Sequence, residues 1–390
     1  MNRPLHILPV IILSQFCGTA LWFAGNAVMF DLQEAWALQG DVVGPVTNAV
    51  QIGFIVGTLL FAVLAIADRF APRSVFLMCA LLGALANAAL LIAPRDMSSL
   101  ITLRLLTGFF LAGIYPVGMK IAASWYDQGL GRALGYLVGA LVLGTAFPHL
   151  VRGLDTGLPW ERVMIVASML AAAGGVAMYV LVPDGPHLPK GAAFNPRALG
   201  AIFTTARLRA SAFGYFGHMW ELYALWAFLP VWLLAYTRNQ GLDLNISLWT
   251  FAVIAVGAVT CAWGGIVSLR WGSARVSASM LAISGVCCLL SPLAFEWPPW
   301  AFLGFVLLWG ATVSSDSPQF SALNAANAPR AYVGSVLTMI NSLGFLITVL
   351  SIQILTVAAA WLDPGYLFLL LAPGPVIGLL SMRPLLRSRT

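Results

Sequence analysis

Charge is scarce in this sequence: only 9% of its 390 residues are Asp, Glu, Lys or Arg, and 60% are hydrophobic. Soluble domains carry about a quarter charged residues, so this chain has too little charge to cover a water-exposed surface. Its apolar runs reach about 20 residues, the length that crosses a bilayer as a helix. The sequence therefore predicts an all-α integral membrane protein.

Several functional signatures are also missing. Nothing resembles the nucleotide-binding loop G-x-x-x-x-G-K-[ST], so the chain is not an ATP-driven pump unless a partner supplies the ATPase. The five cysteines lie inside predicted spans without zinc spacing, so we expect no metal and no cofactor. An intramembrane enzyme needs paired catalytic groups at one depth in the membrane, and we find no such pair, so we expect no enzyme and no catalytic residues. A sensor would carry an appended soluble domain, and we expect none. The net charge of +6 comes from residues flanking helices, so no nucleic-acid partner is expected.

Hydropathy divides the chain into twelve predicted membrane spans, six on each side of a polar, Pro/Gly-rich segment. The spans lie near residues 7–30, 43–66, 74–94, 98–123, 133–151, 161–183, 210–236, 246–268, 276–293, 299–324, 332–355 and 365–381. The first apolar run is too long for a signal peptide and is read as a retained span. We expect two six-helix halves, 1–184 and 210–390, joined by a cytoplasmic linker over 185–209.

Basic residues gather on one side of these spans, which fixes the expected orientation. If both termini are cytoplasmic, that side holds 15 of the 20 basic residues: Arg3, Arg69, Arg73, Lys120, Arg132, Lys190, Arg197, Arg207, Arg209, Arg270, Arg275, Arg330, Arg383, Arg387 and Arg389. The opposite side holds only Arg95, Arg152, Arg162 and Arg238. The bias predicts a multi-pass protein of the plasma (inner) membrane with both termini cytoplasmic.

The two halves repeat one another. A short basic turn, ADRFAPRSV, follows the second span at 67–75, and LRWGSARVS follows the eighth at 269–277. The stretch LAIADRFAPRS resembles the loop signature of the major facilitator superfamily, roughly G-x-x-x-D-R-x-G-R-R, with Asp68, Arg69 and Arg73 matching. The departures are Leu64, Ala71 and Pro72.

A second stretch, RLLTGFFLAGIYPVG at 104–118, resembles the fourth-helix pattern of the same superfamily. The resemblance implies two parallel six-helix halves around a central cavity. It also implies that the loop is a conformational latch, in which Asp68 accepts hydrogen bonds from helix N-termini and arginines. The alternative is that Arg69 and Arg73 only anchor the loop in the cytoplasm.

In the superfamily the first, fourth, seventh and tenth helices line the cavity. The ionisable residues inside predicted spans are Arg104 on the fourth, His218 and Glu221 on the seventh, and Asp316 on the tenth. Charged residues inside membranes usually face a bundle interior or a water-filled cavity. The resemblance therefore implies that these four residues lie around the cavity.

Glu221 lies about 17 Å into the seventh span, near the bilayer midplane, with His218 one turn earlier. A carboxyl group there can exchange a coupling proton, contact a substrate, or form a static pair with His or Arg. Asp316 precedes Pro318, which is expected to interrupt the tenth helix. Asp316 is either a second titrating group, a gate residue or part of a network that supports the kink.

Substrate contacts are expected from several polar and aromatic residues. Arg104 suits an anionic group because its guanidinium is a fixed fork of donors, although a structural role is the equal alternative. The other candidates are Tyr115 on the face of Arg104, a stripe of Gln15, Thr19, Trp22 and Asn26 on the first span, and Trp220 on the seventh.

The sequence thus predicts a monomeric secondary transporter in the lipid bilayer that works by alternating access. Its cargo is expected to be a small polar or amphiphilic organic solute, with organic anions among the candidates, and its coupling ion a proton. The alternative is a proton-driven multidrug efflux antiporter. Against that alternative, Pro148 is displaced from the efflux signature of the fifth span.

Overall fold

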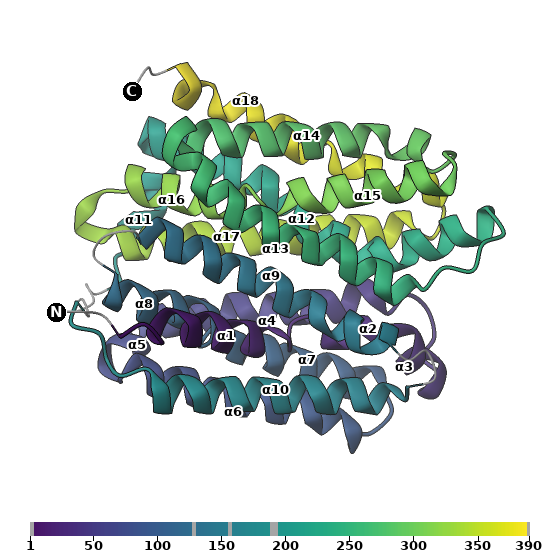
Figure 1. Ribbon diagram of the computed structural model, residues 1–390, viewed down its shortest axis with the longest axis horizontal. Coiled ribbons are helices and arrows are strands. Elements are labelled where there is room, and N and C mark those ends of the chain that lie inside the picture. Colours follow the sequence, from purple (N-terminus) through teal and green to yellow (C-terminus); the bar gives the residue numbers. More distant parts are fainter. Residues whose placement is uncertain (1–3, 127–129, 155–157, 188–193, 388–390) are drawn as a thin grey trace. The chain divides into compact units, whose positions relative to one another are not determined.

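The computed structural model describes residues 4–126, 130–154, 158–187 and 194–387, and within these ranges the secondary structure is entirely helical (Figure 1). Arg3, Lys190 and Arg389, which contribute to the predicted charge bias, lie outside the described residues. The chain divides into two compact units, residues 1–194 and 195–390. The division falls inside the segment that we predict as the linker.

The N-terminal unit contains the first six predicted spans. Its helical segments are α1 (Ile7–Thr19), α2 (Ala24–Ala27), α3 (Met29–Ala35), α4 (Val43–Val63), α5 (Ile66–Arg69), α6 (Pro72–Ala88), η1 (Ala89–Leu91), α7 (Met97–Leu111), α8 (Tyr115–Trp125), α9 (Leu130–Leu154) and α10 (Trp160–Leu181).

The C-terminal unit contains the remaining six spans. Its segments are α11 (Arg197–Thr204), α12 (Ala206–Asn239), α13 (Ile246–Trp271), α14 (Ser273–Ala294), α15 (Pro299–Val313), α16 (Ser317–Asn327), η2 (Arg330–Tyr332), α17 (Val333–Ala358), η3 (Pro364–Leu371) and α18 (Pro373–Arg387). The short helix α11 lies within the predicted linker and packs against α17 and the start of α12.

Ten continuous or nearly continuous helical segments in the described residues are long and apolar enough to cross a membrane. The first and tenth predicted spans are absent from that set because each is interrupted. The first is split between Thr19 and Ala24, and the tenth between Val313 and Ser317. With these two interrupted spans included, the fold is consistent with the twelve predicted helices.

The continuous helical spacing expected within 7–30 is therefore wrong, whereas the interruption of the tenth span, 299–324, next to Pro318 is as predicted. The fourth span is also interrupted, between Leu111 and Tyr115. Pro116 and Pro318 lie in the first turn of the helix after each of the later two breaks. Proline fits there because its ring fixes φ and the first-turn N–H has no intrahelical partner. Hydropathy measures apolar content and does not register such breaks.

Glycines allow the second and fourth spans, and likewise the eighth and tenth, to pack backbone to backbone. A Cβ atom on Gly108 would lie well inside contact distance of the Val50 carbonyl oxygen, and one on Gly310 would do the same to Val253. Small residues permit such close approach in membrane bundles. In both halves the proline after the break follows this glycine by eight residues. The internal repeat therefore includes the position of the helix break.

We expect Gly310→Ala to destabilise the C-terminal half by about 1–3 kcal/mol, because its methyl group would overlap the Val253 carbonyl. Gly304→Ala on the same helix is the matched control, since a Cβ there meets open space. Thermal unfolding of the two purified variants in detergent measures the difference. Equal stability of the two variants would contradict the close packing described above.

Candidate functional site

In the N-terminal half, Arg104 of α7 is fully buried and holds the interrupted first span. Its Nη2 donates to the carbonyl oxygens of Leu21 (2.9 Å) and Trp22 (2.8 Å), which lie in the break between α1 and α2. Backbone carbonyls released from a helix need donors inside a membrane. Arg104 supplies them, so its guanidinium contacts the part of the first span that is not helical.

The same guanidinium extends the network to two more helices. Nη1 donates to Asn87 Oδ1 on α6 at 2.8 Å. Asn87 Nδ2 in turn donates to Ser168 Oγ (2.9 Å) and to the Met164 carbonyl (3.2 Å) on α10. The first, third, fourth and sixth spans thus meet in one buried network. No carboxylate is recorded among the partners of Arg104 in the described residues.

The predicted polar stripe of the first span does not exist as a single face, because the helix breaks between Thr19 and Ala24. Gln15 lies against Gly118 of α8, and Thr19 lies against Gly144 of α9 and donates to its own helix. Trp22 Nε1 donates to Gln51 of α4 at 3.3 Å. Nearby, Asn26 Nδ2 donates to Thr47 Oγ1 at 2.7 Å.

The break in the fourth span also separates Arg104 from Tyr115, so helical spacing does not place them on one face as predicted. Lys120, for which we predict no functional role, lies after the same break, on α8. Lys120 Nζ donates to the Asp68 carboxylate and, at 2.7 Å, to the Ala67 carbonyl. Asp68 was expected to accept from helix N-termini and arginines; a lysine of α8 is its recorded partner.

The two arginines of the same loop differ from one another. Arg73 Nε lies 3.7 Å from Asp184 Oδ1, and its guanidinium carbon lies 5.5 Å from the centre of the Tyr179 ring. Arg69 is exposed at the end of α5. Both contacts of Arg73 are with residues near the end of the sixth span, so this ion pair links the loop to the last helix of its own half.

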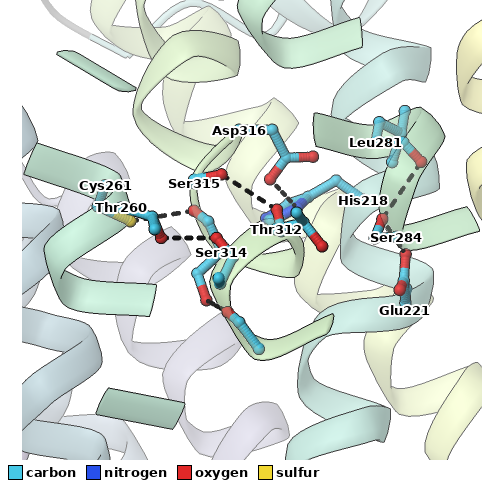
Figure 2. A network of polar contacts seen from close by, with 12 residues as sticks. His218, Glu221, Thr260, Cys261, Leu281, Ser284, Thr312, Ser314, Ser315 and Asp316 are labelled. Carbon is cyan, nitrogen blue, oxygen red and sulfur yellow. Dashed lines mark hydrogen bonds and ion pairs between the residues drawn. The ribbon is translucent and has the colours of Figure 1, made fainter. Parts of the chain in front are cut away.

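In the C-terminal half, Glu221 of α12 is fully buried and contacts two neutral groups, of which Figure 2 shows Ser284. Trp309 Nε1 of α15 lies 2.6 Å from Oε1, and Ser284 Oγ of α14 lies 3.0 Å from Oε2. Ser284 Oγ also lies 3.2 Å from the Leu281 carbonyl oxygen. Sequence reasoning missed Trp309 and Ser284, because tryptophan and serine are common in the predicted spans.

These distances fit two proton arrangements, because a serine hydroxyl carries one proton. When Glu221 is ionised, Ser284 donates to it. When Glu221 is protonated, its own O–H can donate to Ser284 Oγ, and Ser284 then donates to the Leu281 carbonyl. Trp309 donates in both cases. The site therefore has hydrogen-bond partners for both forms without movement of a heavy atom.

His218 does not pair with Glu221, although the two are one turn apart. Its Nδ1 lies 2.8 Å from Asp316 Oδ1, and both side chains are buried (Figure 2). Asp316 lies in the break that ends at Ser317, the first residue of α16. The contact thus joins the continuous seventh span to the interrupted part of the tenth.

Side chains of α13 and of the tenth span itself satisfy carbonyl groups around this break. Cys261 Sγ donates to the Ser314 carbonyl at 3.1 Å, and Thr260 Oγ1 donates to Ala311 at 2.6 Å. Ser315 Oγ donates to the Thr312 carbonyl at 3.2 Å. These bonds give the released carbonyls the internal partners that a membrane segment requires.

Trp220, predicted as a substrate contact, is on the interface of α12 with the last span. Its Nε1 donates to the Leu370 carbonyl of η3 at 3.2 Å. Five residues before it, Tyr215 donates from its hydroxyl to Asn341 Oδ1 at 2.9 Å. No group of three or more potential metal ligands is found among the described residues.

Comparison with solved structures gives whole-length matches of the fold. The chain aligns with the human organic anion transporter MFSD10 (TETRAN) at a TM-score of 0.74 and 14% identity, covering 98% of this chain and 100% of that one. The nucleoside transporter NupG, solved as a point mutant, aligns at a TM-score of 0.72 and 13% identity, with the same coverage of both chains. The transporter FucP, solved in the outward conformation, aligns at a TM-score of 0.69 and 14% identity. This alignment covers 98% of this chain and 99% of that one.

Sequence comparison adds a relative and a family. The niacin transporter NiaP of Acinetobacter baylyi is 32% identical over 200 residues, which cover 45% of this chain and 42% of that protein. The chain thus spans less than half the length of this relative. The Major Facilitator Superfamily model matches residues 11–352. Its matched relatives are transporters rather than enzymes, and the chain belongs to the major facilitator superfamily.

Proposed function

We propose that this protein is a proton-coupled secondary transporter of a small organic solute, working by alternating access as a monomer in the plasma membrane. Both termini would be cytoplasmic. The observation that carries the proposal is the environment of Glu221, in which Trp309 and Ser284 are neutral and Ser284 can turn its single proton toward Leu281. A carboxyl group with partners in both protonation states can take up and release the coupling proton.

Charge balance supports Glu221 as the proton carrier. A buried charge in a membrane protein is costly unless it is paired, and Asp316 has the His218 imidazole 2.8 Å away, which is a cation when protonated. Glu221 has no cationic partner recorded in the described residues. Binding a proton removes its charge; after the proton is lost, the carboxylate keeps its two donors but has no countercharge until water or a cation reaches it. The carboxyl group therefore links its protonation to the opening of the site.

His218 and Asp316 are proposed as a second titrating pair. Their ion pair spans α12 and the break in the tenth span. Loss of the charge on either partner would leave the other buried and unpaired, which destabilises such an arrangement. Protonation of the pair would thereby alter how the two segments of the tenth span are held.

Small organic carboxylates are the first solutes to test. The relative from Acinetobacter baylyi is named as a niacin transporter, and niacin is a pyridine carboxylic acid. Gln15 and Asn26 are proposed solute contacts, because both side chains are buried and each has a polar atom without a recorded hydrogen bond in the described residues. Thr19, Trp22, Tyr115 and Trp220 remain further proposed contacts.

For Arg104, the recorded contacts favour the structural alternative over direct substrate binding. Both terminal nitrogens are engaged, one by Asn87 and the other by two backbone carbonyls, and only Nε has no recorded hydrogen bond among the described residues. Releasing the guanidinium to a solute would leave those three acceptors without donors. We therefore propose that Arg104 shapes the first span beside the solute and does not hold the solute itself.

Uptake into proteoliposomes tests the function. Labelled nicotinate, a neutral nucleoside and a lipophilic cation such as ethidium are compared with and without an imposed pH gradient. Accumulation of nicotinate that disappears when a protonophore collapses the gradient supports the proposal. Proton-driven transport of ethidium alone would support the multidrug alternative. Uptake independent of the pH gradient would contradict proton coupling.

The Asp68–Lys120 contact is proposed as the latch of the loop after the second span, together with Arg69 and Arg73. The pair is partly exposed, and such pairs contribute at most about 1 kcal/mol. We expect Lys120→Met and Asp68→Asn each to change the uptake rate by about two- to fivefold, in the same direction. The double variant should match either single variant, since all three lack the same interaction. Additive effects would show that the contact is not the latch.

A further inference from the structure

At the end of the C-terminal half where α11 lies, every described charged residue is basic. Between residues 195 and 390 there are five acidic residues, of which Glu221 and Asp316 are buried in spans. The other three, Asp243, Glu296 and Asp363, lie in connections at the opposite end. The α11 end carries eight described arginines, all exposed: Arg197, Arg207, Arg209, Arg270, Arg275, Arg330, Arg383 and Arg387.

Helix α11 presents two apolar faces at this end. Ala198, Ala201 and Ile202 form the buried face, which packs against α17 and α12. Leu199 and Phe203, one turn apart, form a second face that is 42% and 47% exposed. A helix already packed on its own half thus leaves a narrow apolar stripe uncovered, and its first residue, Arg197, is an exposed arginine.

Contacts with the start of α12 fix this exposed stripe beside a second arginine. Arg209 Nη1 donates to the Phe203 carbonyl at 2.8 Å. The Phe203 ring lies edge-on to Phe213, with the ring centres 6.2 Å apart. At the other end of the helix, the Asn195 amide donates to Ser335 Oγ of α17 at 3.0 Å. The apolar stripe and the guanidinium of Arg209 therefore lie side by side on a braced segment.

The length of α12 places this segment at the level of lipid headgroups. Its 34 residues span about 50 Å, whereas the hydrocarbon core of a bilayer is about 30 Å thick. Shared between the two ends, the excess of about 20 Å places the first turn, with Arg207 and Arg209, beyond the hydrocarbon. In Figure 1, α11, α16 and the last turns of α18 lie toward the same end of this half.

We propose that α11 and the first turn of α12 form a binding site for an anionic phospholipid. Leu199 and Phe203 would insert among the acyl chains, and Arg197 and Arg209 would bind the phosphate of the headgroup. Arginine suits this role because its planar fork of donors matches phosphate, and amphipathic helices with basic borders lie in the bilayer interface. Two exposed apolar side chains are too few for a protein interface of about 800 Å² per partner.

The arrangement goes beyond the positive-inside bias, which requires only charge. In the N-terminal half two basic residues at this kind of position, the end of a span, pair with acids: Lys120 with Asp68 and Arg73 with Asp184. In the described part of the C-terminal half no ion pair with a carboxylate is recorded for Arg197 or Arg209. Their charges remain available for a lipid phosphate.

The five native cysteines are buried, so a single introduced cysteine can be labelled selectively. Leu199→Cys, labelled with a fluorophore, is reconstituted into phosphatidylcholine vesicles that contain a spin-labelled lipid. Quenching is compared between spin-labelled phosphatidylglycerol and spin-labelled phosphatidylcholine. The control is Leu293→Cys, which is 61% exposed near the last residue of α14, at the opposite end of the same half.

We expect phosphatidylglycerol to be preferred at position 199 by about fivefold for each arginine that contacts the headgroup. The preference should fall on adding Arg197→Gln and Arg209→Gln, and it should persist with Arg238→Gln, at the opposite end. Position 293 should show no preference. Equal quenching by the two lipids at position 199, absence of quenching there, or a preference unchanged by the two arginine substitutions would each overturn the proposal.

Discussion

Replacement of Glu221 by Gln is expected to abolish proton-driven accumulation while leaving solute exchange across the membrane within about threefold of wild type. Gln keeps the size of the side chain, so its carbonyl can still accept from Trp309 and its amide can donate to Ser284. It cannot release a proton. A pH difference of one unit supports about tenfold accumulation for each coupled proton, and the variant should reach no accumulation at all.

The measurement is steady-state accumulation in proteoliposomes, with counterflow recorded on the same preparation. Glu296→Gln is the matched control, because Glu296 is an exposed carboxylate of the same half and should behave as wild type. Retained accumulation in Glu221→Gln would rule Glu221 out as the proton carrier. Loss of both accumulation and counterflow would assign Glu221 to substrate contact instead.

Replacement of Arg104 by Met is expected to lower the stability of the protein by about 3–6 kcal/mol. The side chain is of similar length, but three acceptors lose their donor: Asn87 Oδ1 and the carbonyls of Leu21 and Trp22. Each buried group left unpaired costs about 1–3 kcal/mol. Removal of the buried charge offsets part of this loss. Arg104→Lys should fall between, since one ammonium cannot reproduce the planar fork.

Thermal unfolding in detergent measures this effect. At about 2–4 °C per kcal/mol, Arg104→Met should unfold more than about 6 °C below wild type. Arg162→Met, an exposed arginine of the same half, should unfold at nearly the wild-type temperature. Wild-type stability of Arg104→Met together with lost nicotinate uptake would make Arg104 a substrate residue and reject the structural role.

Sequence alone predicts the architecture, because hydropathy locates the membrane spans and the distribution of basic residues indicates their orientation. Apolar runs locate the spans, and the signature around Asp68 identifies the superfamily that the sequence comparison confirms. Buried ionisable residues are also visible, since a single carboxylate such as Glu221 stands out in an apolar run. Their partners are not, because Trp309 and Ser284 lie on other helices.

The helix breaks account for most of what sequence reasoning misplaced. Helical spacing relates Arg104 to Tyr115, or Gln15 to Asn26, only while the helix continues between them. The fourth span breaks after Leu111, so helical spacing from Arg104 does not place Lys120, whose recorded partner is Asp68. Pro318 signals the break in the tenth span, whereas no proline marks that of the first. The carbonyl groups of Leu21 and Trp22 in that break accept hydrogen bonds from Arg104, which lies on another helix.

Infrared difference spectroscopy of the reconstituted protein tests the central claim most directly, and it requires no known solute. As the pH is changed from mildly acidic to mildly alkaline, the C=O stretch of a protonated carboxylic acid should disappear in the wild-type protein. The account predicts that the Glu221 component of this band is missing in Glu221→Gln and retained in Asp316→Asn. A band that is unchanged in Glu221→Gln would contradict proton binding at Glu221.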